Sequence, residues 1–169
     1  MISVLQIVHD TMVDGPGFRT SVYSAGCPHG CKGCHNPQSW DIHGGTMRST
    51  ADILDEILSD PFANVTFTGG DPMFQAEGFL ELAKAIRQHS DKSIWCFTGY
   101  RFEQLTELPI HRALLEQIDV LMDGPYVESL RNTDLLFRGS SNQRAILTRE
   151  SLVQGKVVEL TDEEILSIR

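Results

Sequence analysis

Three cysteines lie close together near the start of the chain, in the segment Cys27-Pro-His-Gly-Cys31-Lys-Gly-Cys34. A glycine precedes each of them, so the loop backbone can take positive φ angles and approach a bound group closely. A fully ligated [4Fe–4S] cluster takes four protein ligands, and three cysteines would leave one iron open. An open position is what a catalytic metal centre needs. We therefore predict that Cys27, Cys31 and Cys34 are the metal ligands and the catalytic residues of an iron–sulfur centre.

The alternative for the same cysteines is a structural zinc site, with Cys96, His29 or His35 as the fourth ligand. Zinc sites usually present paired C-x2-C units, and this triplet does not follow that pattern. Cys96 falls within an apolar run, Ile94–Phe97, where a free cysteine is expected to pack in the core. The pattern therefore favours a cluster, while a non-catalytic, zinc-stabilised interaction module remains the alternative from a different class.

Composition narrows the class of protein. The 169 residues predict one domain, spanning 1–169, and 41% hydrophobic residues are enough for a core. The net charge of −9 argues against a nucleic-acid partner, because the overall field would repel phosphates. No apolar run approaches the roughly 20 residues that a membrane span needs, and the N-terminus does not resemble a signal peptide. We expect a cytoplasmic protein with no membrane partner.

Apolar runs of strand and helix type alternate along the chain, which indicates a mostly parallel sheet of the α/β class. Helices are predicted at Thr50–Ser59, Ala76–Gln88 and His111–Gln117. Strands are predicted at Val4–His9, Thr20–Ala25, Asn64–Thr68, Ser93–Thr98, Asp119–Met122 and Arg144–Thr148, and more weakly at Lys156–Leu160.

Four of the predicted strands run directly into residues that are unusual at a strand end. These are Gly26-Cys27, Gly69-Gly70-Asp71-Pro72, Gly99-Tyr100 and Asp123-Gly124-Pro125. In parallel α/β folds the ligand site lies at the carboxyl ends of the strands. The four turns are therefore expected to meet at one site, with the cysteines among them.

The cysteine spacing resembles the cluster signature of the radical S-adenosylmethionine superfamily. The segments Asp14-Gly-Pro-Gly-Phe-Arg19 and His35-Asn36-Pro37 resemble its glycyl-radical-enzyme activating branch. Trp95-Cys-Phe-Thr-Gly-Tyr100, Asp123-Gly-Pro-Tyr126 and Phe137-Arg-Gly-Ser-Ser-Asn-Gln-Arg144 narrow the resemblance to the activating proteins of the anaerobic ribonucleoside-triphosphate reductase. Gly33 replaces an aromatic residue common in the superfamily, and Asp71 replaces its usual glutamate; both variants fit the narrower group.

The resemblance implies an open, partial (β/α) barrel of the radical-enzyme type, a [4Fe–4S] cluster and S-adenosylmethionine. It implies that Gly33, Cys34, His35 and Asn36 lie against the adenosine. It also implies that Gly69, Gly70 and Asp71 lie at the methionyl end, where Asp71 either accepts from the ammonium or orients the turn. The implied reaction makes a 5′-deoxyadenosyl radical, which takes hydrogen from a glycine of the partner reductase.

Other residues have less specific roles. Arg19 is expected to pair with Asp14 or another carboxylate, and Arg138–Arg144 to shape the entrance for the reductase. A flavodoxin-like or other low-potential electron donor must dock near the cluster, and Arg19, Lys32 and Arg48 are a candidate basic patch for it. The alternative enzymes are an activase of another glycyl-radical enzyme, such as pyruvate formate-lyase, and a small radical enzyme such as a deazapurine synthase.

Overall fold

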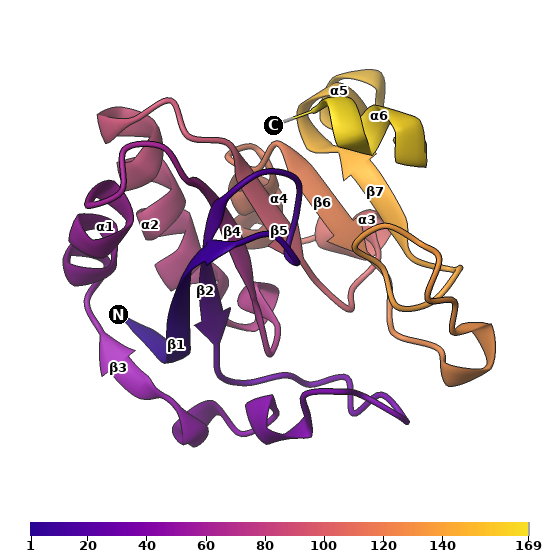
Figure 1. Cartoon of the computed structure of the whole chain (residues 1–169), viewed down its shortest axis with the longest axis horizontal. Helices are drawn as coiled ribbons and strands as arrows, with labels where there is room; N and C mark the ends of the chain where they lie inside the picture. Colours follow the sequence, from indigo (N-terminus) through magenta and orange to yellow (C-terminus); the bar gives the residue numbers. More distant parts are fainter. Residues whose placement is uncertain (169) are drawn as a thin grey trace.

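A seven-stranded sheet forms the centre of the molecule in a computed structural model, which describes residues 1–168 (Figure 1). The strand order is β3-β1-β2-β4-β5-β6-β7. The four strands β2, β4, β5 and β6 are parallel, while β1 and β7 run antiparallel to their neighbours. The strands are β1 (Ile2–Thr11), β2 (Arg19–Ser24), β3 (Thr46–Arg48), β4 (Asn64–Gly69), β5 (Ile94–Phe97), β6 (Val120–Asp123) and β7 (Arg144–Leu147).

The open, mostly parallel sheet of an α/β protein is thus confirmed: β3 and β7 are its edges in the described residues, and they do not pair. Whether its curvature is that of a partial barrel stays a prediction. No helix among residues 1–168 is long and apolar enough to cross a membrane.

One face of the sheet is covered by helices and holds the larger core. Val22, Phe67 and Cys96 point to this side, where Phe79 and Ile86 of α2 pack with them. Figure 1 shows α1 and α2 together beside the strands. The helices are α1 (Thr50–Leu58), α2 (Ala76–His89), α3 (Phe102–Leu105), α4 (Pro109–Leu115), α5 (Thr148–Gln154) and α6 (Asp162–Ser167).

The opposite face carries the alternate residues of the same strands, since successive side chains of a strand point to opposite sides. Trp95, Val120 and Met122 form a smaller core there, together with Leu160 and Ile165 from the C-terminal segment. Near the carboxyl ends of β2, β4 and β5, the residues of this face that line a cavity include Tyr23, Thr68 and Phe97.

Several elements differ from the sequence predictions. Lys156–Leu160 forms no strand, and only a bridge between Ile146 and Glu159 joins it to β7. Thr148, predicted as the end of a strand, begins α5. The helix predicted at His111–Gln117 begins two residues earlier, at Pro109, because proline is favoured in the first turn. The short elements β3, α3, α5 and α6 lack the long periodic patterns that make an element visible in sequence.

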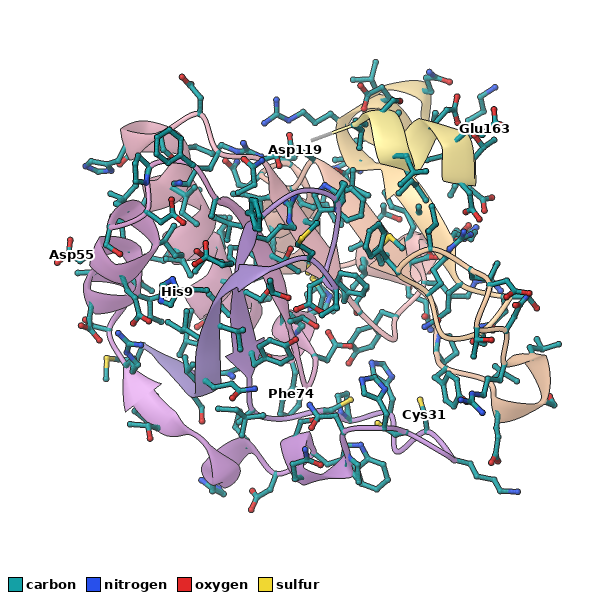
Figure 2. All side chains as sticks on the ribbon, viewed as in Figure 1. His9, Cys31, Asp55, Phe74, Asp119 and Glu163 are labelled. Carbon is teal, nitrogen blue, oxygen red and sulfur yellow. The ribbon has the colours of Figure 1, made fainter. Side chains whose placement is uncertain are left out.

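The parallel strands β2, β4, β5 and β6 bring their carboxyl ends to the same end of the sheet, as predicted. Figure 2 shows Cys31 at this end and Asp119, the residue before β6, at the opposite end of the molecule. The segment that carries the three cysteines follows β2 directly and runs along this end.

Candidate active site

The three predicted cysteine ligands lie in the loop between β2 and the short 3-10 helix η1 (Pro37–Ser39). Cys27, Cys31 and Cys34 are free, half-buried thiols, and all three line a cavity of about 880 Å³. The start of the loop is fixed by its backbone: Cys27 N–H donates to the Trp40 carbonyl at 3.2 Å. The loop is therefore a fixed rim of a cavity that is large enough for a ligand.

The sulfur of Cys34 accepts a backbone hydrogen bond, because the N–H of Asn36 donates to it at 3.4 Å. Burial raises the pKa of the Cys27 thiol to about 11, with smaller opposing and supporting contributions from its neighbours. A metal removes the proton of a coordinating thiol outright, so this shift does not prevent ligation.

The turn after β4 packs directly on the cysteine loop. Gly69 has a φ of +105°, and a Cβ on it would lie 2.4 Å from the backbone nitrogen of Ser24. A Cβ on Gly70 would lie 2.4 Å from the carbonyl oxygen of Gly26. Both glycines line the cavity, so their lack of side chains lets two backbones and a ligand meet at one place.

Asp71 is fully buried, and its carboxylate is surrounded by donors. It accepts hydrogen bonds from Met73 N–H at 2.9 Å, Thr98 Oγ1 at 2.9 Å and Gly99 N–H at 3.0 Å. Its Oδ2 also lies 2.5 Å from His29 Nε2. Of the two roles predicted for Asp71, the structure contains the turn-orienting contact; a contact with a ligand ammonium stays a prediction.

The other predicted ligand contacts, Gly33, His35 and Asn36, line the same cavity.

Two residues that were not predicted as part of the site also line the cavity, Asp14 and Tyr23. Tyr23 Oη donates a hydrogen bond to Asp14 Oδ2 at 2.6 Å. Burial, and next the hydrogen bond to Asp14, raise the pKa of Tyr23. The alternation of β2 was the available signal, because every second residue of that strand faces this side.

The predicted pairing of Arg19 is wrong. Its side chain is fully buried and donates to Thr66 Oγ1 at 2.7 Å and to the Val65 carbonyl at 2.8 Å, with its guanidinium 5.2 Å from the Trp95 ring. A buried guanidinium satisfied by neutral oxygens can hold the loop before β2 without a carboxylate.

The predicted basic patch of Arg19, Lys32 and Arg48 is wrong, because one of these cations is buried and another is engaged in ion pairs. Arg19 is inaccessible, and Arg48 forms ion pairs with Asp52 and Glu56 of α1. Lys32 is the remaining member of the predicted patch, and its ammonium lies 3.6 Å from the carboxylate of Glu128.

Residues between Gly124 and Gln143 form a second wall of the cavity. They belong to the orange loops at the right of Figure 1. Gln143 holds this wall together, because its amide donates to the Gly124 carbonyl and accepts from the N–H groups of Gly139 and Ser140. Arg138 also lines the cavity and pairs with Asp162. The segment Arg138–Arg144 was predicted to shape the entrance for the reductase. Three of its residues, Arg138, Gly139 and Gln143, line the cavity.

The donor set fits an iron–sulfur group. Three thiols share one cavity, Cys34 already accepts an N–H group, and the neighbouring Gly69-Gly70 turn adds no side chains to the cavity. Within residues 1–168, no three His, Cys, Asp or Glu side chains are placed to hold one metal ion. A zinc ion needs its ligands about 2.0–2.3 Å from a single point, whereas a cluster spreads its ligands over several irons.

Comparison with known proteins decides the family. Residues 13–146 match the model of the 4Fe-4S single cluster domain. The anaerobic ribonucleoside-triphosphate reductase-activating protein of Haemophilus influenzae is 32% identical over 84% of this chain and 96% of its own length. Its counterpart in Vibrio cholerae is 36% identical over 78% of this chain and 89% of its own. The chain belongs to this activating-protein family. The phage T4 member is 35% identical over 78% of this chain and 85% of its own length.

The comparisons bear on two points that the sequence left open. The 4Fe-4S domain match supports an iron–sulfur cluster over the zinc alternative, and it spans the whole cysteine loop. The relatives also agree with the narrow resemblance carried by Arg138–Arg144, since all three bear the name of the reductase-activating protein.

Proposed function

We propose that this chain is a radical S-adenosylmethionine activase that generates a glycyl radical on the anaerobic ribonucleoside-triphosphate reductase. The observation that carries the proposal is the shared cavity: the three cysteines and the Gly69-Gly70 turn line it together, at the carboxyl ends of parallel strands. The names of the relatives supply the partner. The cysteine loop supplies the chemistry.

Cys27, Cys31 and Cys34 would hold a [4Fe–4S] cluster and leave one iron open to the amine and carboxylate of S-adenosylmethionine. When bound and reduced, this cluster supplies the electron that breaks the S–C5′ bond into methionine and a 5′-deoxyadenosyl radical. Gly69 and Gly70 would receive the methionyl end because their backbone is accessible there, and Gly33, His35 and Asn36 would lie against the adenosine.

The chain's own contribution is enclosure and orientation. The wall of residues 124–143 meets the cysteine loop where Glu128 lies 3.6 Å from Lys32, and its hydrogen bonds through Gln143 keep it in place. A primary carbon radical reacts with whatever is near, so a closed wall directs it to the glycine Cα of the partner. Asp14 and Tyr23 offer polar groups on the cavity surface for the approaching peptide.

The proposal places the protein in the cytoplasm as one radical-enzyme unit over residues 1–169, reduced by a flavodoxin-like or other low-potential donor. Free thiols at Cys27, Cys31 and Cys34 suit a reducing compartment. The net charge of −9 gives no long-range attraction to an acidic donor, so recognition of such a donor would rest on short-range contacts.

The deciding experiment is anaerobic reconstitution with iron, sulfide, a reductant, S-adenosylmethionine and the candidate reductase. We expect 5′-deoxyadenosine together with a glycyl-radical EPR doublet on the reductase. Deoxyadenosine without that doublet would point to another protein substrate, such as pyruvate formate-lyase. A colourless protein that contains zinc and no iron or sulfide would exclude the proposed enzyme.

A further inference from the structure

Two aromatic side chains are exposed beside the cysteine loop, outside the cavity that the three thiols line. Trp40 directly follows the 3-10 helix η1 and is 40% exposed. Phe74 lies in the 3-10 helix η3 (Pro72–Gln75), which follows the glycine turn after β4, and is 49% exposed. Neither residue lines the cavity. Figure 2 shows Phe74 and Cys31 at the same end of the molecule.

Both aromatic residues lie close to Cys27, the first proposed ligand. The Trp40 carbonyl accepts from the N–H of Cys27 at 3.2 Å. A Cβ on Gly26 would lie 2.7 Å from Phe74 Cδ1 and 2.7 Å from Ile42 Cδ1, so these two side chains cover the backbone just before Cys27. We call Trp40, Ile42 and Phe74 the loop patch. A protein bound on the loop patch is separated from Cys27 by these side chains and one stretch of backbone.

The chain that carries the loop patch has few acidic side chains. The protein has 23 Asp and Glu residues, but between Asp14 and Asp52 only Asp41 is acidic. Beyond Phe74, the next exposed carboxylate along the chain is that of Glu77 in α2. A net charge of −9 opposes the approach of another acidic protein, and this repulsion is weakest where acidic side chains are sparse. An acidic partner therefore meets less repulsion at the loop patch than the net charge suggests.

A small apolar surface next to a redox centre suits a transient electron-transfer contact. Such complexes have interfaces at the low end of the size range, and aromatic residues are enriched in interface cores. The exposed edge of a flavin is flat and largely apolar, so it packs well on aromatic side chains. A donor on the loop patch also leaves the cavity free for S-adenosylmethionine and the reductase.

We propose that the loop patch is the docking surface of an acidic, flavodoxin-like electron donor. One electron leaves the anionic flavin hydroquinone, which becomes the neutral semiquinone, and the cluster on the cysteines takes up that electron; no proton moves. This docking role deepens the proposed function and rests on it in one respect, that the cysteines hold a redox-active cluster. It also assigns the donor and the reductase to different surfaces.

The test is the dissociation constant of oxidised flavodoxin and the reconstituted protein, measured by calorimetry without S-adenosylmethionine or reductase. We expect Trp40→Ser and Phe74→Ser each to weaken binding about tenfold. Their iron content and their rate of reduction by dithionite should stay at the wild-type level, because neither side chain lines the cavity. Trp40→Phe should keep most of the affinity.

Phe62→Ser is the matched control. Phe62 is 90% exposed but precedes β4, so it lies at the end of that strand opposite to Phe74. We expect the wild-type dissociation constant for this variant. An equal loss of affinity in Phe62→Ser and Phe74→Ser would mean that any exposed aromatic side chain has the same effect, and would overturn the proposal.

The charge argument has its own test at Gln38, an exposed residue of η1 two positions before Trp40. Gln38→Glu should weaken flavodoxin binding at low salt and Gln38→Lys should strengthen it, and both effects should fade at high salt. Equal affinities in the two variants would contradict the proposal. This pair also decides the matter if Trp40→Ser and Phe74→Ser take up no iron.

Other occupants of the loop patch are outcomes of the same titrations. Flavodoxin that does not bind the wild-type protein, or a ferredoxin that binds the loop patch in its place, would overturn the proposal. So would a Trp40→Ser variant that binds flavodoxin normally and loses affinity for the reductase.

Failure of the docking role and failure of the proposed function remain distinguishable. A wild-type protein that binds flavodoxin through the loop patch but makes no 5′-deoxyadenosine would refute the function alone. Normal deoxyadenosine formation, with wild-type flavodoxin affinity in both Trp40→Ser and Phe74→Ser, would refute the docking role alone.

Discussion

Arg144 and Asp123 face each other directly across the antiparallel strands β7 and β6. The guanidinium contacts both carboxylate oxygens, with Nη2–Oδ2 at 2.6 Å and Nε–Oδ1 at 3.0 Å. It also reaches Glu103 of α3 at 2.9 Å. The last residue of the Arg138–Arg144 segment is therefore an internal brace of the sheet edge, whereas Arg138 and Gln143 of the same segment line the cavity.

Replacing this brace should destabilise the protein. Asp123 is 1% exposed and would be left as an uncompensated buried charge, so we expect Arg144→Met to lower the free energy of unfolding by about 3 kcal/mol. Urea denaturation followed by circular dichroism measures this loss. Arg112→Met is the control, because Arg112 and Glu116 form a 4.0 Å pair in which both side chains are about half exposed. Equal losses in the two variants would contradict the buried-brace interpretation.

Glu103, the second carboxylate that contacts Arg144, should make the stability of the protein depend on pH. The hydrogen bond from Arg144 lowers the pKa of Glu103 below its ordinary value of 4.5. A carboxylate with a lowered folded-state pKa stabilises the protein above the unfolded-state value, and that stability is lost as the pH falls through the folded-state pKa. We expect Glu103→Gln to be less stable than wild type at pH 7, by under about 1 kcal/mol for so exposed a group, and the gap to close below pH 4.5.

The control for Glu103 is Glu107→Gln, an exposed carboxylate in the turn that follows α3. Denaturant midpoints measured from pH 7 to pH 3 should show no such convergence for Glu107→Gln. A gap for Glu103→Gln that widens on acidification would contradict the assigned sign.

The close approach at Gly70 gives a third prediction. An added methyl group would meet the Gly26 carbonyl at 2.4 Å, so the turn or the cysteine loop must shift. We expect Gly70→Ala to cost about 1–3 kcal/mol of stability and to weaken S-adenosylmethionine binding measured by calorimetry. Gly44→Ala is the matched control, since its nearest neighbour would be an ordinary 3.7 Å away. Unchanged binding in Gly70→Ala would argue against a ligand at this turn.

The assignment of three cysteines, and not four, is testable by iron analysis. Single replacements of Cys27, Cys31 or Cys34 by alanine should reduce iron and sulfide after reconstitution to near zero and abolish 5′-deoxyadenosine formation. Cys96→Ala should keep the iron, because Cys96 is fully buried in β5 and packs in the larger core. A loss of iron in Cys96→Ala would make it a ligand and remove the open position from the proposed centre.

Elements with strong local signals could be predicted from the sequence. The strands predicted at Asn64–Thr68 and Ser93–Thr98 are β4 and β5, and the helix predicted at Ala76–Gln88 is α2. The short helices α5 and α6 could not be predicted in this way, because they pack only after the chain has returned to β7 and have too few residues for a periodic pattern.

The partners of charged side chains were also beyond the sequence. Arg19 and Asp14 are close in the chain, which suggested an ion pair, but Arg19 lies over Trp95 and Asp14 accepts from Tyr23. A side chain selects its partner from everything that folding brings within reach, and residues distant in sequence make up most of that set.

The sequence by itself determined the features on which the proposed chemistry rests: three thiols at fixed spacing, the glycine turn after β4, and the strand ends that bring them together. These features are local, because ligand type and backbone freedom belong to individual residues. Only the tertiary structure decided which side chains act on the cysteine loop. Asp71 is 42 residues from His29, and their 2.5 Å contact exists because parallel β2 and β4 place the two turns side by side.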